Sequence, residues 1–313
     1  MKTSILLFFS FLFLSLTISC SPEDDSTGSE VDALEIQDPM DDEMDTDDTM
    51  DNSLAALVLT DVSYGADSQQ VYDLYLPEGR TAATTKVMVL IHGGGWTSGD
   101  KQDMAQFVNY FLENHPDHAI VNLNYVLAQI GGPAAFPNQY LDIEAAINQV
   151  IAQQEELQIL PEFGFFGTSA GAHLAMMYDY TYDNDDLVKF VIDIVGPSDF
   201  TDPFFADDPN FPLALSLLAD ASQFPAGTDL AIANSPALVA HSGSSPTFLF
   251  YGDQDPIVPL TNGQRLNTAL DNQNITHEFT VYEGGHGDDW SDADGIDLSL
   301  KTSSYVNTYL AIE

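Results

Sequence analysis

The pentapeptide GTSAG at residues 167–171 holds the residue best suited to covalent chemistry, Ser169. The apolar segment before it, residues 163–166, predicts a short buried strand, and residues 170–178 predict the start of a helix. The pattern G-x-S-x-G is typical of a sharp turn between a strand and a helix, which exposes the serine hydroxyl above the edge of a sheet. Its glycines allow the backbone to make that turn. We therefore predict that Ser169 is a nucleophile.

A glycine-rich segment, HGGGW at residues 92–96, lies upstream of this serine. It follows the apolar run KVMVLI at residues 86–91, which predicts a central strand. A glycine-rich turn at a strand end leaves backbone N–H groups free to stabilise negative charge on a carbonyl oxygen, as acyl transfer requires. We predict that the N–H groups of Gly94, Gly95 and Ala170 form such an oxyanion hole.

An acidic residue and a histidine follow Ser169 in the order that serine hydrolases with this turn use. A predicted strand at residues 247–251 runs into the sequence GDQDPIVP, which contains Asp253 and Asp255. Another predicted strand, FTVY, runs into EGGHG, which contains His286. The order alone predicts His286 as the general base and leaves both aspartates as candidates for its acidic partner.

Together these motifs resemble those of α/β-hydrolase esterases of the hormone-sensitive-lipase and feruloyl-esterase-like (BD-FAE-like) group, which includes kynurenine formamidase-like enzymes. The resemblance covers about residues 55–313 and rests also on YDLYLP, the Asn-Tyr pair and GTSAGAHLA. It implies an α/β-hydrolase fold, with a mostly parallel, doubly covered sheet and a small cap or loop excursion. It also implies that the acid is the last residue of G-x-x-D, which is Asp255.

The resemblance implies a serine carboxylesterase in which Ser169 attacks, His286 transfers the proton and Asp255 orients the imidazole. Water then hydrolyses the acyl-enzyme, so no metal ion or other cofactor is expected. The expected substrates are neutral short-chain acyl esters, or acetyl and feruloyl esters of polysaccharides. An arylformamidase-like amide hydrolase and a non-catalytic surface-binding protein on a hydrolase scaffold are the alternatives.

The remaining elements predict one α/β domain in which strands and helices alternate. Two strands at 57–62 and 70–75 are expected to form an antiparallel pair at one edge of the sheet. The other predicted strands are 86–91, 118–123, 163–167, 189–195, 247–251 and 275–282. The predicted helices are 101–113, 139–157, 170–180, 261–272 and 295–311.

The resemblance implies a substrate-covering excursion between residues 195 and 246. Within this stretch residues 197–212 are rich in Pro, Asp and Phe, and a short helix is expected at 213–218. The loop at 131–137 is a candidate for the opposite wall. Trp96 and Phe200 are the candidate substrate-binding residues, and for both the alternative is that they pack against the core.

Four other histidines have simpler interpretations. His92 is expected to support the glycine loop, and His173 is expected to pack or to hydrogen-bond in the helix after Ser169. His115 and His118 are predicted to be surface or loop residues.

The N-terminus resembles that of a bacterial lipoprotein. An apolar stretch at residues 5–18 predicts a signal peptide over 1–19, followed by Cys20 as the lipid attachment site. Residues 20–53 are acidic and lack aromatic side chains, which predicts a disordered tether before a catalytic domain at 54–313. We expect an exported protein in the outer membrane, with surface display as one option and a periplasmic or secreted protein as the alternative. Cys20 is the only membrane contact expected.

Charge excludes one class of partner. The chain has 49 acidic and 7 basic residues, a formal net charge of −42. Fourteen of the acidic residues precede residue 53, so the predicted domain is itself strongly acidic. Nucleic-acid binding needs a basic face, which this composition does not provide. Anionic substrates would be repelled, so neutral esters are expected. Nothing in the sequence indicates an oligomeric state.

Overall fold

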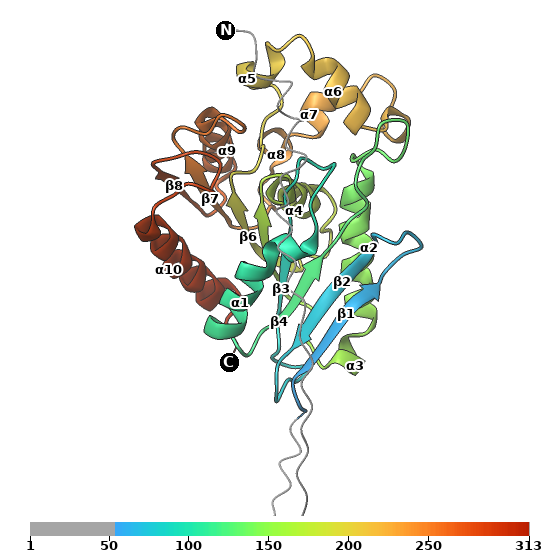
Figure 1. The fold of residues 1–313 in the computed structure, drawn as a ribbon, viewed down its shortest axis with the longest axis vertical. Helices are drawn as coiled ribbons and strands as arrows, with labels where there is room; N and C mark the ends of the chain where they lie inside the picture. Colours follow the sequence, from blue (N-terminus) through green and yellow to red (C-terminus); the bar gives the residue numbers. More distant parts are fainter. Residues whose placement is uncertain (1–53, 313) are drawn as a thin grey trace, which may run out of the picture. The chain divides into compact units, whose positions relative to one another are not determined.

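An eight-stranded sheet forms the centre of residues 54–312, the part of the chain that the structure, a computed structural model, describes (Figure 1). The strand order is β1-β2-β4-β3-β5-β6-β7-β8. The strands are β1 (Leu57–Ser63), β2 (Val71–Leu76), β3 (Val87–Ile91), β4 (Ala119–Leu123), β5 (Phe163–Thr168), β6 (Val188–Ile194), β7 (Thr247–Gly252) and β8 (His277–Tyr282). The predicted signal peptide, Cys20 and the predicted tether lie outside the described residues.

Most of the sheet is parallel. β1 pairs antiparallel with β2, as the sequence predicts for this edge, and β2 pairs antiparallel with β4. From β4 to β8 all pairs are parallel. Parallel strands end at the same edge of a sheet, and ligands bind at this edge in open α/β sheets. The segments after β3, β5, β7 and β8, which carry the predicted site residues, therefore meet there.

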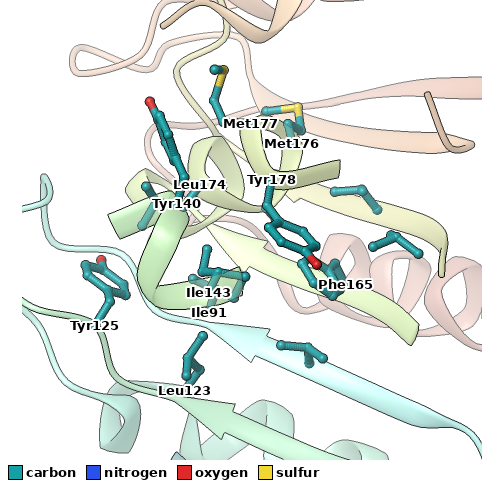
Figure 2. Packing of buried hydrophobic residues seen from close by; sticks show 14 of the residues in the cluster. Ile91, Leu123, Tyr125, Tyr140, Ile143, Phe165, Leu174, Met176, Met177 and Tyr178 are labelled. Carbon is teal, nitrogen blue, oxygen red and sulfur yellow. The ribbon is translucent and has the colours of Figure 1, made fainter. Parts of the chain in front are cut away.

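Both faces of the sheet are covered, as predicted. Side chains of a strand alternate between the two faces, so Val87, Val89 and Ile91 of β3 join one buried cluster while Met88 and Leu90 join another. The first cluster includes side chains from α2, α4 and α9, and the second includes side chains from α1 and α10. Figure 1 shows where these helices lie around the sheet. In Figure 2, aliphatic side chains of β3, β4 and α2 come together beneath α4.

The helices follow the predicted pattern with local differences. They are α1 (Ala105–Asn114), α2 (Asn138–Ala152), α3 (Gln154–Leu157), α4 (Ala170–Thr181), α5 (Pro203–Ala206), α6 (Phe211–Leu218), α7 (Leu230–Ala233), α8 (Pro236–Val239), α9 (Leu260–Gln273) and α10 (Asp292–Tyr309). The predicted helix 139–157 is divided into α2 and α3, and the predicted helix 101–113 begins with a 3₁₀ turn, Lys101–Met104. Within residues 54–312 no helix has the length and apolar character needed to cross a membrane.

The excursion between β6 and β7 contains four short helices, α5 to α8, where the sequence predicts one. The missed helices are four residues long, too short to display a hydrophobic period. Local signals begin them instead, such as the Asp202 carboxylate that accepts a hydrogen bond from the Phe204 N–H. The excursion is joined to the loop before α2, because the Phe136 N–H donates to the Leu218 carbonyl and the Asp220 N–H to the Phe136 carbonyl.

His115 and His118 lie in the loop between α1 and β4, as predicted, but both are buried rather than at the surface. Helix α10 covers them: His115 Nε2 lies 3.0 Å from Ser303 Oγ, and His118 Nε2 lies 2.8 Å from the Leu310 carbonyl oxygen. Burial lowers the pKa of both imidazoles, that of His115 to about 4. The helix that covers them lies almost 200 residues later in the chain, so no local sequence pattern indicates their burial.

A carboxyl group lies in the core near the end of β6. Asp193 is fully buried, and its Oδ1 accepts a hydrogen bond from the Gly196 N–H. Burial raises the pKa of Asp193 to about 7. The Tyr251 hydroxyl oxygen lies 2.7 Å from Asp193 Oδ2 and 2.5 Å from the Gly196 carbonyl oxygen. A protonated Asp193 can donate to this hydroxyl, which leaves the tyrosine proton for the carbonyl.

We expect the Asp193→Asn variant to become more stable than the wild type as pH rises. A carboxyl whose pKa is raised from 3.8 to about 7 contributes stability below pH 4, and this stability is lost as pH rises through 7. The amide keeps both hydrogen bonds and does not titrate. The difference in unfolding free energy between variant and wild type should grow from pH 4 to pH 7, by at most about 1.4 kcal/mol per pH unit, and then level off. Urea unfolding at pH 5, 6, 7 and 8 measures this difference, and a constant value would contradict the assignment.

Candidate active site

Ser169 occupies the turn between β5 and α4. Its φ is 51° and its ψ is −119°, a strained conformation for a residue with a side chain. The Ser169 N–H donates to the carbonyl of Ile194, which fixes the turn against β6. A Cβ on Gly171 would lie 2.1 Å from the Ile91 carbonyl oxygen, so only glycine lets α4 begin this close to β3. The strand, turn and helix predicted from G-x-S-x-G are present.

The structure brings Ser169, His286 and Asp255 together in one hydrogen-bonded chain. His286 Nε2 lies 2.8 Å from Ser169 Oγ, and His286 Nδ1 lies 2.6 Å from Asp255 Oδ2. Because a carboxylate only accepts, Nδ1 carries the proton and Nε2 is free to accept from the serine hydroxyl. The other carboxylate oxygen accepts from the N–H groups of Ile257 and Val258, which holds Asp255 in place.

Asp253 and Asp255 occupy different environments. The Asp255 side chain is fully buried beneath the imidazole. Asp253 is exposed, and its Oδ1 accepts a hydrogen bond from the Gly284 N–H rather than from the histidine. Only Asp255 therefore contacts His286, which is the arrangement that the family resemblance implies.

The glycine loop after β3 adopts a backbone that exposes its N–H groups. Gly94, Gly95 and Trp96 have consecutive positive φ values of 113°, 59° and 64°. Within residues 54–312 the N–H groups of Gly94, Gly95 and Ala170 donate no hydrogen bond. The loop lies against the nucleophile, because a Cβ on Gly93 would be 3.2 Å from the Ser169 Cβ. Unpaired donors beside a serine can stabilise an oxyanion.

Three side chains, one of them from the loop itself, hold this loop in place. The His92 imidazole stacks on the Tyr125 ring at 4.3 Å, and burial lowers the pKa of His92. The Tyr125 hydroxyl donates to the His92 carbonyl, and Gln139 Nε2 donates to the Trp96 carbonyl. Tyr125 was expected only as part of the Asn-Tyr pair, and no pattern in the sequence indicated Gln139. The sequence around Gln139, in the first turn of α2, does not indicate a hydrogen bond to Trp96, which is 43 residues away in the chain.

Trp96 and Phe200, the candidate substrate-binding residues, are buried where the glycine loop meets the excursion between β6 and β7, which forms the cap. Their side chains are only 4% and 3% exposed. Their rings meet edge to face at 5.8 Å, and the Phe136 ring contacts both. The structure therefore favours the packing interpretation for both residues over direct contact with a substrate.

A mostly parallel, doubly covered sheet with a serine at the β5–α4 turn and an acid and a histidine after later strands defines an α/β hydrolase. The chain belongs to the BD-FAE family, whose model matches residues 72–270.

Known relatives agree with this assignment. Esterase LipQ of Mycobacterium tuberculosis is 25% identical over 231 residues, which cover 67% of this chain and 52% of LipQ. Chlorogenic acid esterase of Aspergillus niger is 29% identical over 138 residues, which cover 42% of this chain and 27% of that protein. The chain thus spans about half the length, or less, of these curated relatives.

Solved structures share the fold. A truncated form of a carbohydrate esterase from gut microbiota aligns with a TM-score of 0.63 at 21% identity, over 79% of this chain and 96% of that one. At this identity the similarity concerns the fold alone.

Proposed function

We propose that this protein is a serine carboxylesterase that works through Ser169, His286 and Asp255. The observation that carries the proposal is the unbroken chain of hydrogen bonds, 2.8 Å from serine to histidine and 2.6 Å from histidine to aspartate. The curated relatives named as esterases support the same class of reaction.

In the first half of the reaction, Ser169 Oγ attacks the ester carbonyl carbon while His286 Nε2 accepts the hydroxyl proton. The imidazolium that forms is stabilised by the Asp255 carboxylate. Negative charge develops on the carbonyl oxygen, and the N–H groups of Gly94, Gly95 and Ala170 are the donors that we assign to it. Collapse of this intermediate breaks the ester bond, and His286 returns the proton to the leaving alcohol.

In the second half, water takes the place of the alcohol. His286 accepts a proton from the water as it attacks the acyl-enzyme. The second tetrahedral intermediate then collapses: the bond from the acyl carbon to Ser169 Oγ breaks, His286 returns the proton to Ser169 Oγ, and the acid is released. Every proton transfer uses the same imidazole nitrogen. The geometry therefore serves both halves without rearrangement of Asp255.

The substrate that we propose is a neutral ester, either a short-chain acyl ester or an acetyl or feruloyl ester of a polysaccharide. The net charge of −42 disfavours anionic substrates at long range. The relative named chlorogenic acid esterase supports an ester as the class of substrate.

A substrate panel tests this proposal. The purified protein would be assayed on p-nitrophenyl esters from acetate to decanoate, on methyl ferulate, on acetylated xylan and on N-formylkynurenine. We expect turnover of at least one ester, with an optimum that reports the size of the acyl pocket. Hydrolysis of the formamide alone would replace the esterase by an amide hydrolase, and no turnover of any compound would favour a binding protein.

We also propose that Cys20 carries a lipid that anchors the protein, on the basis of the apolar stretch before this single cysteine. The Cys20→Ala variant, expressed in a bacterium that processes lipoproteins, should move from the membrane fraction to the soluble fraction, because the chain then lacks its acyl anchor. Immunoblots of the two fractions measure the change. Unaltered membrane association of the variant would overturn the lipid anchor.

A further inference from the structure

His173 lies at the junction of three segments that surround Ser169. It is fully buried on α4, one helical turn after the nucleophile. Its Nδ1 is 3.2 Å from Trp96 Nε1 of the glycine loop, and its Nε2 is 2.9 Å from the carbonyl oxygen of Asn234 in the cap. One imidazole therefore bridges the glycine loop, the nucleophile helix and the cap.

The two partners determine the state of this imidazole. An indole N–H only donates and a carbonyl oxygen only accepts, so Nδ1 must be unprotonated and Nε2 must carry the proton. The rings of Trp96, Phe136 and Phe200 all lie within 5.3 Å of the imidazole. Burial lowers the pKa of His173 to about 4, which keeps the ring neutral. His173 thus has the tautomer opposite to that of His286.

The Trp96 end of the bridge is a strained position. A tryptophan with a φ of 64° persists only where its surroundings hold it there. The Trp96 carbonyl accepts from the Ala128 N–H at 2.9 Å and from Gln139 Nε2 at 2.8 Å. The bond from the indole to His173 fixes the side chain. Gly94 and Gly95 directly precede this residue, so the directions of their N–H groups depend on its conformation.

The Asn234 end of the bridge is anchored as firmly. Asn234 is fully buried between α7 and α8. Its side chain accepts a hydrogen bond from the Tyr140 hydroxyl at 3.0 Å and donates to the Leu230 carbonyl at 2.8 Å. The cap at this point cannot shift without disturbing the bond to His173.

We propose that His173 is a positioning residue, which holds the glycine loop in the conformation that directs the Gly94 and Gly95 N–H groups at the reacting carbonyl oxygen and couples that loop to the cap. The role in turnover rests on the proposed esterase function. The role in loop conformation does not, and it can be tested without a substrate.

The test uses His173→Asn, Trp96→Phe and the double variant. Trp96→Phe keeps an aromatic ring but removes the indole N–H, and His173→Asn removes the imidazole bridge. The matched control is His118→Asn, another buried histidine bonded to a carbonyl, on the opposite face of the sheet. Active sites are counted with a fluorophosphonate, so that kcat refers to folded protein.

We expect His173→Asn to lower kcat for p-nitrophenyl acetate by about 10- to 100-fold, because misdirected oxyanion donors weaken transition-state binding. KM should change by less than about threefold, since ground-state binding does not use these donors. His118→Asn should lower the melting temperature but keep kcat per site within about twofold of the wild type. If both residues act through one bond, the double variant should lose no more kcat than the more impaired of the two single variants.

Amide resonances of ¹⁵N-labelled protein give the readout that needs no turnover. His173→Asn should shift the Gly94 and Gly95 amide signals, whereas His118→Asn should leave them in place. Unchanged signals in His173→Asn, or a kcat per site equal to that of the wild type in an active enzyme, would overturn the positioning role. If the Gly94 and Gly95 signals shift in His173→Asn but the wild-type protein hydrolyses no ester, the role of His173 in loop conformation stands and the proposed esterase function is rejected.

Discussion

The Ser169→Ala variant should lose ester hydrolysis, with kcat reduced by about 10⁴-fold or more. The serine oxygen is the only nucleophile within hydrogen-bond distance of His286 Nε2 in the described residues, and alanine provides none. The fold should remain, because alanine places the same Cβ at the strained turn. We expect the unfolding free energy to change by no more than about 1 kcal/mol. Steady-state kinetics with the best ester of the panel and urea unfolding measure the two quantities.

A matched control for this variant is Ser198→Ala. Ser198 is also buried, close to the end of β6, but its hydroxyl donates to the Asn262 carbonyl, and within residues 54–312 it forms no hydrogen bond with His286. The control should retain kcat per folded molecule while losing some stability. Full turnover by Ser169→Ala would remove this serine from the mechanism, whatever the control does.

The second large effect separates the two aspartates. Asp255→Asn should lower kcat by about 10⁴-fold, because an amide can present its NH₂ group to His286 Nδ1 and so favour the wrong tautomer. Asp253→Asn should lower kcat by less than about tenfold, since its carboxylate is exposed and contacts the Gly284 N–H. Each variant differs from the wild type by one oxygen replaced by nitrogen, which makes each the control for the other.

Measurement of kcat and KM for both variants under one set of conditions decides between them. A larger loss in Asp253→Asn would transfer the acidic role to that residue and would mean that the 2.6 Å contact of Asp255 is structural. Equal small losses would mean that neither carboxylate orients His286 during turnover.

Local patterns in the sequence account for much of the architecture. Runs such as KVMVLI predict strands because their apolar side chains suit a sheet that is covered on both faces. The structure has β3 at this run, and its side chains alternate between the two buried clusters. The turn at Ser169 follows from the small residues around it, since Gly171 must pass close to the Ile91 carbonyl. These features depend on neighbours in the chain, so they can be predicted without knowledge of distant contacts.

The cap shows where such patterns stop. Its four-residue helices start at local capping residues and never complete enough turns to reveal a period. For Trp96 and Phe200 the sequence left substrate binding and core packing open. Their packing depends on contacts between aromatic rings of different segments of the chain, which local patterns do not reveal.

Residue type and order were therefore sufficient to predict the sheet, the nucleophile turn, the glycine loop and the triad candidates, because backbone geometry follows from short-range sterics and from the alternation of apolar side chains. The family resemblance already implied Asp255 rather than Asp253 as the acid. Three features required the folded chain: the hydrogen bond between Asp255 and His286, the burial of Trp96 and the bridge made by His173. Each depends on atoms that are distant in sequence and that meet only when β3, α4, β7 and the cap have packed. Hydrogen bonds require distances near 3 Å, and only the tertiary packing of these elements brings such groups that close.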